Sequence, residues 1–308
     1  MDREIPKRLQ KYNLGFRIIP DPTGANIYVC GTSQTGVTDF ALTLLKYKSV
    51  GGLVWSATYD STGLYDAGID MKCNSSSVVV YGVSGVSSIS GDIIVRSYSA
   101  STGAISSQSR INNAGMYVTR PVAIAKDRAE NIYLSGISND VGRMDDIVII
   151  KLDSLLNLKW RKFYDGGNNQ NDGVSAIKVD SRNNLIVTGW KGNADASKSI
   201  WTIKLRDSVI VWNKIRACPS TGQDAKAFDV DLDPSNNVYV TGAMYGQNRN
   251  SQITIAMDSS GITQWEQFFN NAPNSTDEGR NVKIDSGGVI VYGRSLIGMT
   301  YTYNTMKY

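Results

Sequence analysis

Four aspartates are the residues of this chain best placed to do chemistry as a set, because they recur at one part of a repeat. Asp66, Asp172, Asp224 and Asp277 each lie 16 to 18 residues before a recurring glycine. Carboxylates that converge on one axis repel each other, and a hard cation such as Ca²⁺ relieves that repulsion. In the alternative, each carboxylate accepts hydrogen bonds from nearby loop backbone and no cofactor is needed. The four aspartates are therefore a candidate metal site, with Ca²⁺ as the candidate ion.

A second candidate set could bind a ligand rather than a metal. Trp190, Tyr245 and Arg294 lie in the irregular segments that follow the recurring glycines. Variable loops on a fixed frame commonly carry binding, and an aromatic ring can stack on a sugar or on a partner side chain. Each ring could equally fold over its own loop. We therefore treat these three residues as candidate ligand-binding residues.

The composition removes many kinds of catalysis. The chain has no histidine, which excludes serine–histidine triads, cysteine–histidine dyads and histidine-ligated zinc. The three cysteines, Cys30, Cys73 and Cys218, show no CxxC spacing and predict free thiols. Paired carboxylates of a glycoside hydrolase or polysaccharide lyase need no histidine, so that class stays open. No catalytic motif appears, and the sequence favours a protein that is not an enzyme.

Charge and hydropathy limit the kinds of partner that the chain can have. The 308 residues include 32 Lys and Arg and 28 Asp and Glu, which gives a net charge of +4 without a long single-sign block. This pattern predicts no nucleic-acid groove. No apolar run approaches the roughly 18 residues that would suggest a membrane span. We expect a soluble chain.

A six-residue stretch that ends in glycine recurs along the whole chain and predicts the fold. Asn184 to Gly189 reads Asn-Leu-Ile-Val-Thr-Gly, and its near copies end at Gly31, Gly82, Gly136, Gly242 and Gly293. Successive glycines are 51, 54, 53, 53 and 51 residues apart. Such regular spacing indicates repeated modules that share one core. Six copies predict six similar units.

Each repeat can be divided into four short strands, which we name a, b, c and d in chain order. In the fourth repeat they are predicted at Val174–Val179, Leu185–Thr188, Ile200–Leu205 and Val209–Ile215. An aspartate nine residues before the glycine predicts a turn between strands a and b, as at Asp127, Asp180 and Asp233. Strand d carries a tryptophan in four repeats, which predicts packing between neighbouring sheets: Trp55, Trp160, Trp212 and Trp265.

The two ends of the chain predict how the units are arranged. After Gly293 only one further strand fits, so the last repeat (279–306) lacks strand d, whereas residues 4–12 precede the first strand a and have no sheet of their own. A ring in which the N-terminal strand completes the last sheet leaves no open edge. We predict an all-β, six-bladed β-propeller of four-stranded antiparallel blades, closed by its N-terminus, as one domain over residues 1–308.

The same residues resemble a known repeat family. Asp172 to Gly189 and Asp224 to Gly242 are similar to the bacterial secreted β-propeller repeat family, with its Asn-hydrophobic-Tyr-Val-Thr-Gly stretch, and Asp146 to Trp160 is similar to the second half of that repeat. The resemblance covers essentially the whole chain. It implies an exported or surface-displayed scaffold and no particular reaction.

Three function classes follow. The first is a non-catalytic scaffold at the cell surface or outside the cell that binds a protein partner through the face where the b-to-c loops open. The second is a glycan-binding module, and the third is a carboxylate-dependent glycoside hydrolase or polysaccharide lyase. Met1 is followed at once by Asp2-Arg3-Glu4, a start without a signal peptide, although a leader removed before the numbering begins would leave the same start.

Overall fold

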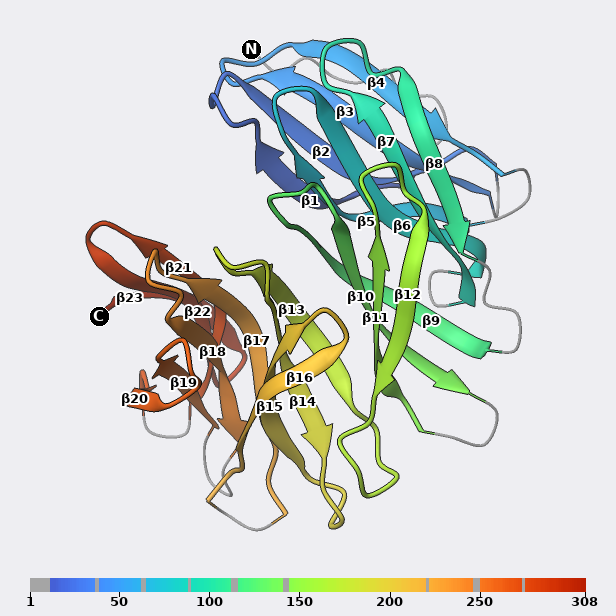
Figure 1. The fold of residues 1–308 in the computed structure, drawn as a ribbon. Coiled ribbons are helices and arrows are strands. Elements are labelled where there is room, and N and C mark those ends of the chain that lie inside the picture. Colours follow the sequence, from blue (N-terminus) through green and yellow to red (C-terminus); the bar gives the residue numbers. More distant parts are fainter. Residues whose placement is uncertain are drawn as a thin grey trace. The chain divides into compact units, whose positions relative to one another are not determined.

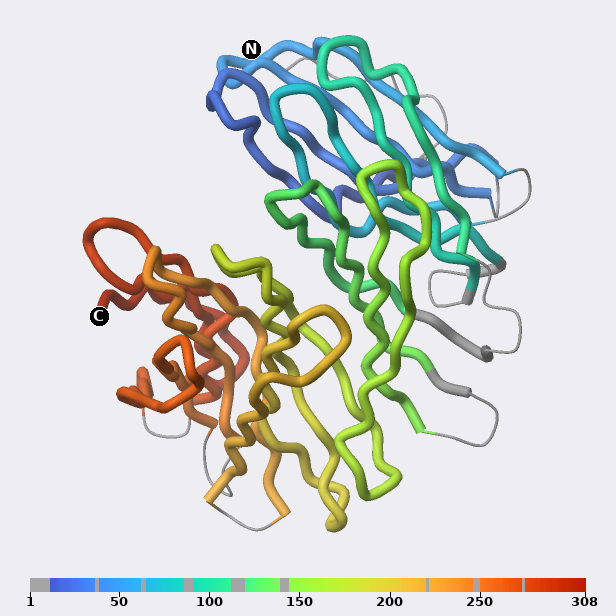
Figure 2. The backbone as a smooth tube through the Cα atoms, viewed as in Figure 1, coloured from blue at the N-terminus to red at the C-terminus, as the bar shows by residue number. Residues whose placement is uncertain are grey.

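The structure, a computed structural model, describes residues 12–36, 39–61, 65–87, 90–111, 116–140, 144–219, 222–245, 250–272 and 275–308. These residues form 23 β-strands joined by turns and loops, with no helix among them. The part of the chain described here therefore contains no helix that could cross a membrane. Figure 1 shows the strands in chain order, and Figure 2 traces the same path as a tube.

Consecutive strands pair antiparallel to form six meanders, which we number as sheets 1 to 6. Sheets 1 and 2 comprise β1 (Asn13–Pro20), β2 (Asn26–Gln34), β3 (Phe40–Lys48) and β4 (Leu53–Tyr59), then β5 (Tyr65–Cys73), β6 (Ser77–Ser87), β7 (Ser90–Ser99) and β8 (Ile105–Ile111). Sheet 3 comprises β9 (Met116–Lys126), β10 (Ile132–Asp140), β11 (Asp146–Leu152) and β12 (Leu158–Tyr164). Sheet 4 comprises β13 (Gly173–Val179), β14 (Leu185–Gly192), β15 (Lys198–Arg206) and β16 (Val209–Arg216).

The last two meanders differ in size. Sheet 5 has four strands, β17 (Ala225–Leu232), β18 (Val238–Tyr245), β19 (Asn250–Met257) and β20 (Thr263–Phe269). Sheet 6 has three described strands, β21 (Thr276–Asp285), β22 (Gly288–Ile297) and β23 (Thr300–Lys307). One parallel residue pair joins sheet 1 to sheet 2, Phe40 with Tyr65, and another joins sheet 5 to sheet 6, Asn250 with Thr276. The prediction of four-stranded antiparallel sheets is confirmed, and residues 4–11 of the predicted closing strand lie outside the described residues. Tyr12, the last residue of that predicted strand, instead belongs beside β2: its N–H donates to the Gln34 side chain at 3.0 Å and its carbonyl accepts from the Gln34 N–H at 2.9 Å.

The chain divides into two compact units. The first contains Met1–Ile124 and Leu155–Asn157, and the second contains Ala125–Ser154 and Leu158–Tyr308. In the first unit a core cluster between sheets 1 and 2 includes Leu42, Leu44 and Val80. In the second unit the cluster between sheets 4 and 5 includes Ile186, Val240 and Ile255. Each core lies between two sheets, because the buried faces of neighbouring sheets supply alternating apolar side chains.

The recurring glycine is explained by a bulge in the strand opposite. Strand a carries one extra residue after its pair with this glycine in all five sheets whose a–b register is described, which are sheets 1, 2, 4, 5 and 6: Phe16, Ile69, Ser175, Phe228 and Arg280. The bulge brings a carbonyl of strand a over the glycine, so a Cβ on Gly31 would lie 1.9 Å from the Leu14 oxygen. The same clash at Gly242 would be 2.0 Å from the Lys226 oxygen. Only glycine allows this close approach.

The turn aspartate Asp180 and two of the strand d tryptophans, Trp55 and Trp212, have the predicted roles. Asp180 accepts hydrogen bonds from the backbone N–H groups of Arg182 and Asn184 at 2.9 and 2.8 Å. The Trp55 indole N–H donates to the Ala100 carbonyl of the next sheet at 3.3 Å, and Trp212 does the same to Ser259 at 3.2 Å. The Trp55 ring lies over Gly103, which has a φ of +74° and would carry a Cβ only 2.8 Å from that ring. Turns and tryptophans therefore serve structure in these sheets.

Candidate ligand-binding site

The predicted site residues lie at one edge of their sheets, where strand a begins and strand b ends. Asp66 and Asp277 pair with Ser84 and Ser295 at the ends of β6 and β22. Asp172 immediately precedes β13, and Asp224 immediately precedes β17. We call this edge of each sheet the a-start edge. It is the edge at which the b-to-c loops leave the sheet.

Three of the four aspartates are buried and bound to their own sheet. Asp66, Asp172 and Asp277 have at most 1% of their surface exposed. The Ser61 backbone N–H and hydroxyl donate to Asp66 at 2.6 and 2.8 Å. Asp172 accepts from the Gly166 and Gly192 N–H groups, and Asp277 accepts from the Asn271 N–H and from the Ser275 and Ser295 hydroxyls. Each carboxylate ties the loop before strand a to its sheet.

Asp224 has a different environment, because it lies one register position earlier. Ala225 pairs with Met244, and the N–H of Tyr245 donates to the Asp224 carbonyl at 2.7 Å. The Asp224 carboxylate is half-buried, accepts from the Lys198 N–H at 2.9 Å and lies 3.0 Å from the Lys226 ammonium. Its charge is thus balanced by lysines, whereas the other three aspartates rely on neutral donors.

One group of aspartates has the spacing of a metal site, and it contains Asp172, one of the four aspartates predicted as a metal site. Among the described residues, carboxylate oxygens of Asp146, Asp165 and Asp172 lie within 4.8 Å of one another. Burial raises the pKa of Asp172, an effect that the Gly166 and Gly192 N–H groups oppose and that the charge of Asp165 increases. Asp224 and Asp277, which are described residues of the same unit as Asp172, do not belong to this acidic group.

Trp190 packs on its own sheet. It pairs with Gly173 across β13 and β14, and a Cβ built on Gly173 would lie 2.2 Å from Cζ2 of the indole. The ring therefore covers the start of strand a in sheet 4. Trp190 belongs to β14 of sheet 4, whereas Tyr245 and Arg294 belong to β18 and β22 of sheets 5 and 6.

Tyr245 and Arg294 do meet, and the residue that joins them is Glu278. The Tyr245 hydroxyl donates to Oε1 of Glu278 at 3.1 Å, and Nε of Arg294 donates to Oε2 at 2.7 Å. Arg280 donates to the same Oε2. These four residues come from β18, β21 and β22 at the a-start edges of sheets 5 and 6. We call Tyr245, Glu278, Arg280 and Arg294 the Glu278 cluster.

The charges of the Glu278 cluster fix its protonation. Burial alone would raise the pKa of Glu278, which is 6% exposed, but the hydrogen bond from Arg294 and the charges of Arg280 and Arg294 outweigh burial and hold that pKa below its usual range. Burial, with the charge of Glu278, raises the pKa of Tyr245 to about 12. At neutral pH the cluster therefore contains a carboxylate, two guanidinium groups and a neutral phenol.

Each of the two arginines donates to Glu278 through one nitrogen, Arg280 through Nη2 and Arg294 through Nε, and each side chain remains partly exposed. Both side chains are 39% exposed. The Arg294 guanidinium lies 5.1 Å from the Tyr301 ring centroid, and the Arg280 guanidinium lies 4.4 Å from that of Phe228. Nε of Arg280 is buried and has no hydrogen-bond partner among the described residues. Arg294 is bound through Nε alone within the described part of the chain, which leaves its terminal N–H groups for a ligand.

Tyr245 and Arg294 are predicted as site residues from the sequence, whereas Glu278 and Arg280 are not. A signal was present: Asp277-Glu278-Gly279-Arg280 stands where sheet 2 has Asp66-Ala67-Gly68-Ile69. Two charged residues thus replace two apolar ones in an aligned strand a. Arg280 is the bulged residue, and the bulge position became visible only with the strand register.

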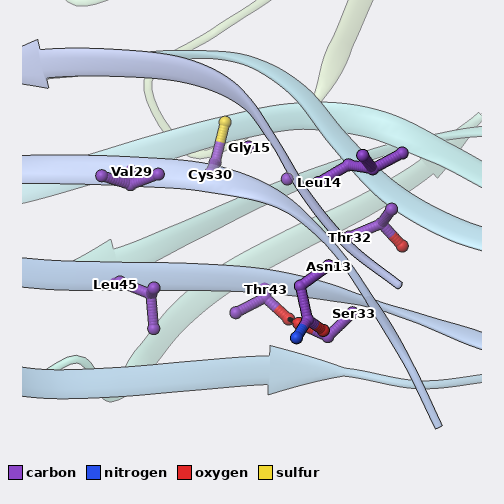
Figure 3. A pocket seen from close by; sticks show the side chains of 10 residues that line it. Asn13, Leu14, Gly15, Val29, Cys30, Thr32, Ser33, Thr43 and Leu45 are labelled. Carbon is purple, nitrogen blue, oxygen red and sulfur yellow. Dashed lines mark hydrogen bonds between the residues drawn. The ribbon is translucent and has the colours of Figure 1, made fainter. Parts of the chain in front are cut away.

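The pocket drawn in Figure 3 lies elsewhere, in sheet 1 of the first unit. It has a volume of about 110 Å³ and lies along β1, β2 and β3 beside the pair of Gly15 and Gly31. Its labelled side chains, such as Val29, Thr43 and Leu45, are apolar or neutral (Figure 3). The pocket reflects missing side chains at the glycine pair and offers no charged group for chemistry.

Comparison with known proteins places the fold. No family model and no curated protein matches the chain. Among solved structures it is similar to Sqt1 from Chaetomium thermophilum, with a TM-score of 0.57 and 12% identity over 92% of this chain and 66% of that one. It is also similar to the polysaccharide lyase Uly1, with a TM-score of 0.54 and 8% identity over 92% of this chain and 79% of that one. A third similar structure is the Hadza microbial sialidase Hz136, with a TM-score of 0.50 and 9% identity over 92% of this chain and 63% of that one.

The fold is β-propeller-like. The chain spans just under two thirds of the length of Sqt1, and identities of 8 to 12% concern the fold alone. By their names, one of these structures is a polysaccharide lyase and another is a sialidase. Function must be argued from the Glu278 cluster itself.

Proposed function

We propose that this chain is a non-catalytic binding protein that holds a protein partner at the a-start edges of sheets 5 and 6. The observation that carries the proposal is the Glu278 cluster, in which Tyr245, Arg280 and Arg294 converge on one buried carboxylate and both arginines remain 39% exposed. Tyrosine and arginine are the residues most enriched at the energetic centres of protein interfaces.

The protonation states favour binding over proton transfer. A general acid or base works best with a pKa near the working pH. The pKa of Glu278 is lowered by two arginines and that of Tyr245 is raised to about 12, so both are far from neutrality. The cluster is therefore suited to hold charge in place rather than to move a proton.

A glycan-binding module is the second candidate. The Tyr301 ring, 54% exposed, lies beside Arg294 and could stack on a sugar face. The likeness to a lyase and a sialidase fits this candidate, and it also fits an enzyme of that kind. A glycan array alongside peptide binding separates the two candidates.

We also propose the ring that the sequence predicts. Sheet 6 has three described strands where the other sheets have four, and residues 4–11 would supply the fourth beside the segment 279–306. The propeller-like solved structures support this arrangement. Membership of the secreted repeat family, a place at the cell surface and a Ca²⁺ ion at the aspartates are further proposals of the same kind.

The function can be tested with a peptide library displayed on phage and the full chain immobilised. Peptides selected on the wild-type protein should lose binding to Arg294→Ala and keep it on Arg182→Ala. Arg182 is an exposed arginine in the turn between strands a and b, at the opposite edge of sheet 4. Peptides that bind Arg294→Ala as well as wild type would place the partner elsewhere and contradict the proposal.

A further inference from the structure

We infer that the group that the Glu278 cluster takes from its partner is a carboxylate, presented by an acidic peptide segment. This inference rests on the proposed function and names the chemistry of the same site. It follows from the local balance of charge, from the way the two guanidinium groups are held, and from the position of Arg280 in its strand.

Positive charge exceeds negative charge around the cluster. Glu278 faces Arg280 and Arg294, while Asp224 faces Lys198 and Lys226. The two halves are adjacent, because the Lys226 ammonium lies 5.5 Å from the ring of Tyr245, whose hydroxyl binds Glu278. Four cations thus surround two carboxylates. An additional anion would be stabilised there.

The guanidinium groups are already oriented for a ligand. Oε2 of Glu278 holds Arg294 through Nε, and the Tyr301 ring lies against its face. Oε2 also holds Arg280, whose face lies against Phe228. A guanidinium that is stacked and bound through one nitrogen keeps its remaining N–H groups in a fixed plane. A planar carboxylate can pair with two such N–H groups at once, with little further loss of side-chain freedom.

The same geometry favours a carboxylate over a phosphate. Any anion on Arg294 shares that guanidinium with the buried carboxylate of Glu278, so it is repelled in proportion to its own charge. A carboxylate carries one negative charge, and a phosphate monoester carries nearly two at neutral pH. For the doubly charged group, the attraction to the four cations and the repulsion from the two carboxylates both double. The cost of removing the group from water rises with the square of its charge, about fourfold, which favours the singly charged carboxylate.

Arg280 makes this site particular to the last sheet. It is the bulged residue of β21, and the corresponding bulged residues of sheets 1, 2, 4 and 5 are Phe16, Ile69, Ser175 and Phe228. A bulge turns its extra side chain away from the regular alternation of the strand. Among these five sheets, only sheet 6 places a cation at that position.

The test uses isothermal titration calorimetry of the full chain with three peptides: hexaglutamate, hexaglutamine and a phosphoserine peptide of the same length. Hexaglutamate should bind, hexaglutamine should give no heat, and the phosphopeptide should bind more weakly than hexaglutamate. Arg280→Ala and Arg294→Ala should each weaken hexaglutamate binding roughly tenfold or more, since each removes a charge-assisted hydrogen-bond pair. Arg182→Ala should leave it unchanged. Arg294→Lys keeps the positive charge but lacks the paired N–H donors of a guanidinium, so it should weaken binding as well. This variant provides the test if an alanine variant fails to fold.

Several results would overturn the inference. Equal binding of hexaglutamine, tighter binding of the phosphopeptide, or hexaglutamate binding that survives both arginine substitutions would each exclude a carboxylate at this cluster. Tighter binding of an oligogalacturonate of equal charge, abolished by Arg294→Ala, would show that the carboxylate belongs to a glycan. If library peptides without acidic residues depend on Arg294, the proposed function stands and this inference fails.

Discussion

Glu278 is the residue on which the candidate site depends, and its ionisation should be visible in stability. Its pKa is lowered in the folded chain, so its contribution to stability is present above the ordinary value of 4.5 and is lost as the pH falls through the folded pKa. We predict that Glu278→Gln reduces the slope of unfolding free energy against pH below about 4.5. Urea unfolding at a series of acid pH values measures this slope. An unchanged slope would mean that the arginines do not hold Glu278 ionised.

Tyr245 should show the opposite dependence at alkaline pH. Its pKa is raised from 10.0 to about 12, so its contribution to stability is complete below 10 and is lost as the pH rises through about 12. We predict that Tyr245→Phe removes one phenol that titrates near pH 12 from the absorbance titration of the native protein. Loss of a phenol that titrates near 10 instead would contradict the buried contact with Glu278.

The three cysteines are free thiols in unequal settings, as the sequence predicts. Burial raises the pKa of Cys30 to about 12, while Cys73 and Cys218 are partly exposed. We predict that all three react with a thiol reagent after unfolding, and that Cys30 alone is protected in the native protein, because a buried thiol forms little thiolate. Cys30→Ser should remove only the protected thiol. Fewer than three thiols in the unfolded chain would indicate a disulfide.

At the scale of the strand pair, the glycine opposite each bulge should be irreplaceable while its partner is not. A Cβ on Gly31 would lie 1.9 Å from the Leu14 oxygen, whereas one on Gly15, its cross-strand partner, meets nothing closer than 3.5 Å. We predict that Gly31→Ala lowers the unfolding free energy by about 3 kcal/mol and that Gly15→Ala is nearly neutral. Chemical denaturation of the two variants measures the difference. Equal losses would show that the carbonyl can move aside.

The sequence predicts the strands well, because each has a local signal. For sheet 4 the predicted limits agree with β13 to β16 within four residues, and the turn of Asp180 is where it is expected. The bulges had no such signal, since the extra residue is recognised only from the register of two strands. The glycine was visible in every repeat, but its cause lies in the strand opposite.

The candidate site was only half visible for the same reason. Tyr245 and Arg294 are large side chains that follow a repeat glycine. Glu278 lies next to Asp277, and only Asp277 matches the repeated aspartate position. Whether a carboxylate is buried beside arginines depends on two sheets together, and residue spacing along one strand carries no information on that.

For the whole molecule, the critical test concerns the last sheet. Sheet 6 has β23 beside β22 and no fourth strand among the described residues, and we propose that residues 4–11 supply it. We predict that deletion of residues 1–11, which keeps the Tyr12 contacts to Gln34, lowers the melting temperature by roughly 5 °C or more, because a strand edge loses its hydrogen bonds. Deletion of residues 1–3 serves as the control and should change little. Equal melting of all three proteins would exclude closure by this segment.

The repeat spacing predicts the individual sheets better than it predicts whether they close into a ring. Neighbouring sheets are joined by one residue pair at most in the described ladders, Phe40 with Tyr65 and Asn250 with Thr276. The rest of their contact is side-chain packing, such as Trp55 on Gly103 and Trp212 on Gly261. Packing sets how many sheets fit around an axis, and that number depends on small angles that no single repeat specifies.

The bulges have a consequence for the synthesis of the chain. A protein built from similar hairpins risks joining strand a of one repeat to strand b of another while it folds. The bulged residue differs from sheet to sheet, from Phe16 and Ile69 through Ser175 and Phe228 to Arg280. A hairpin assembled from the wrong halves would place a guanidinium where a phenyl ring packs, or leave a void in its place. The bulged side chains of sheets 4 and 5 contact the next sheet, Ser175 at the Ala227 carbonyl and Phe228 against the Arg280 guanidinium. The bulged residue of a repeat thus helps to distinguish the correct neighbouring sheet from the wrong one.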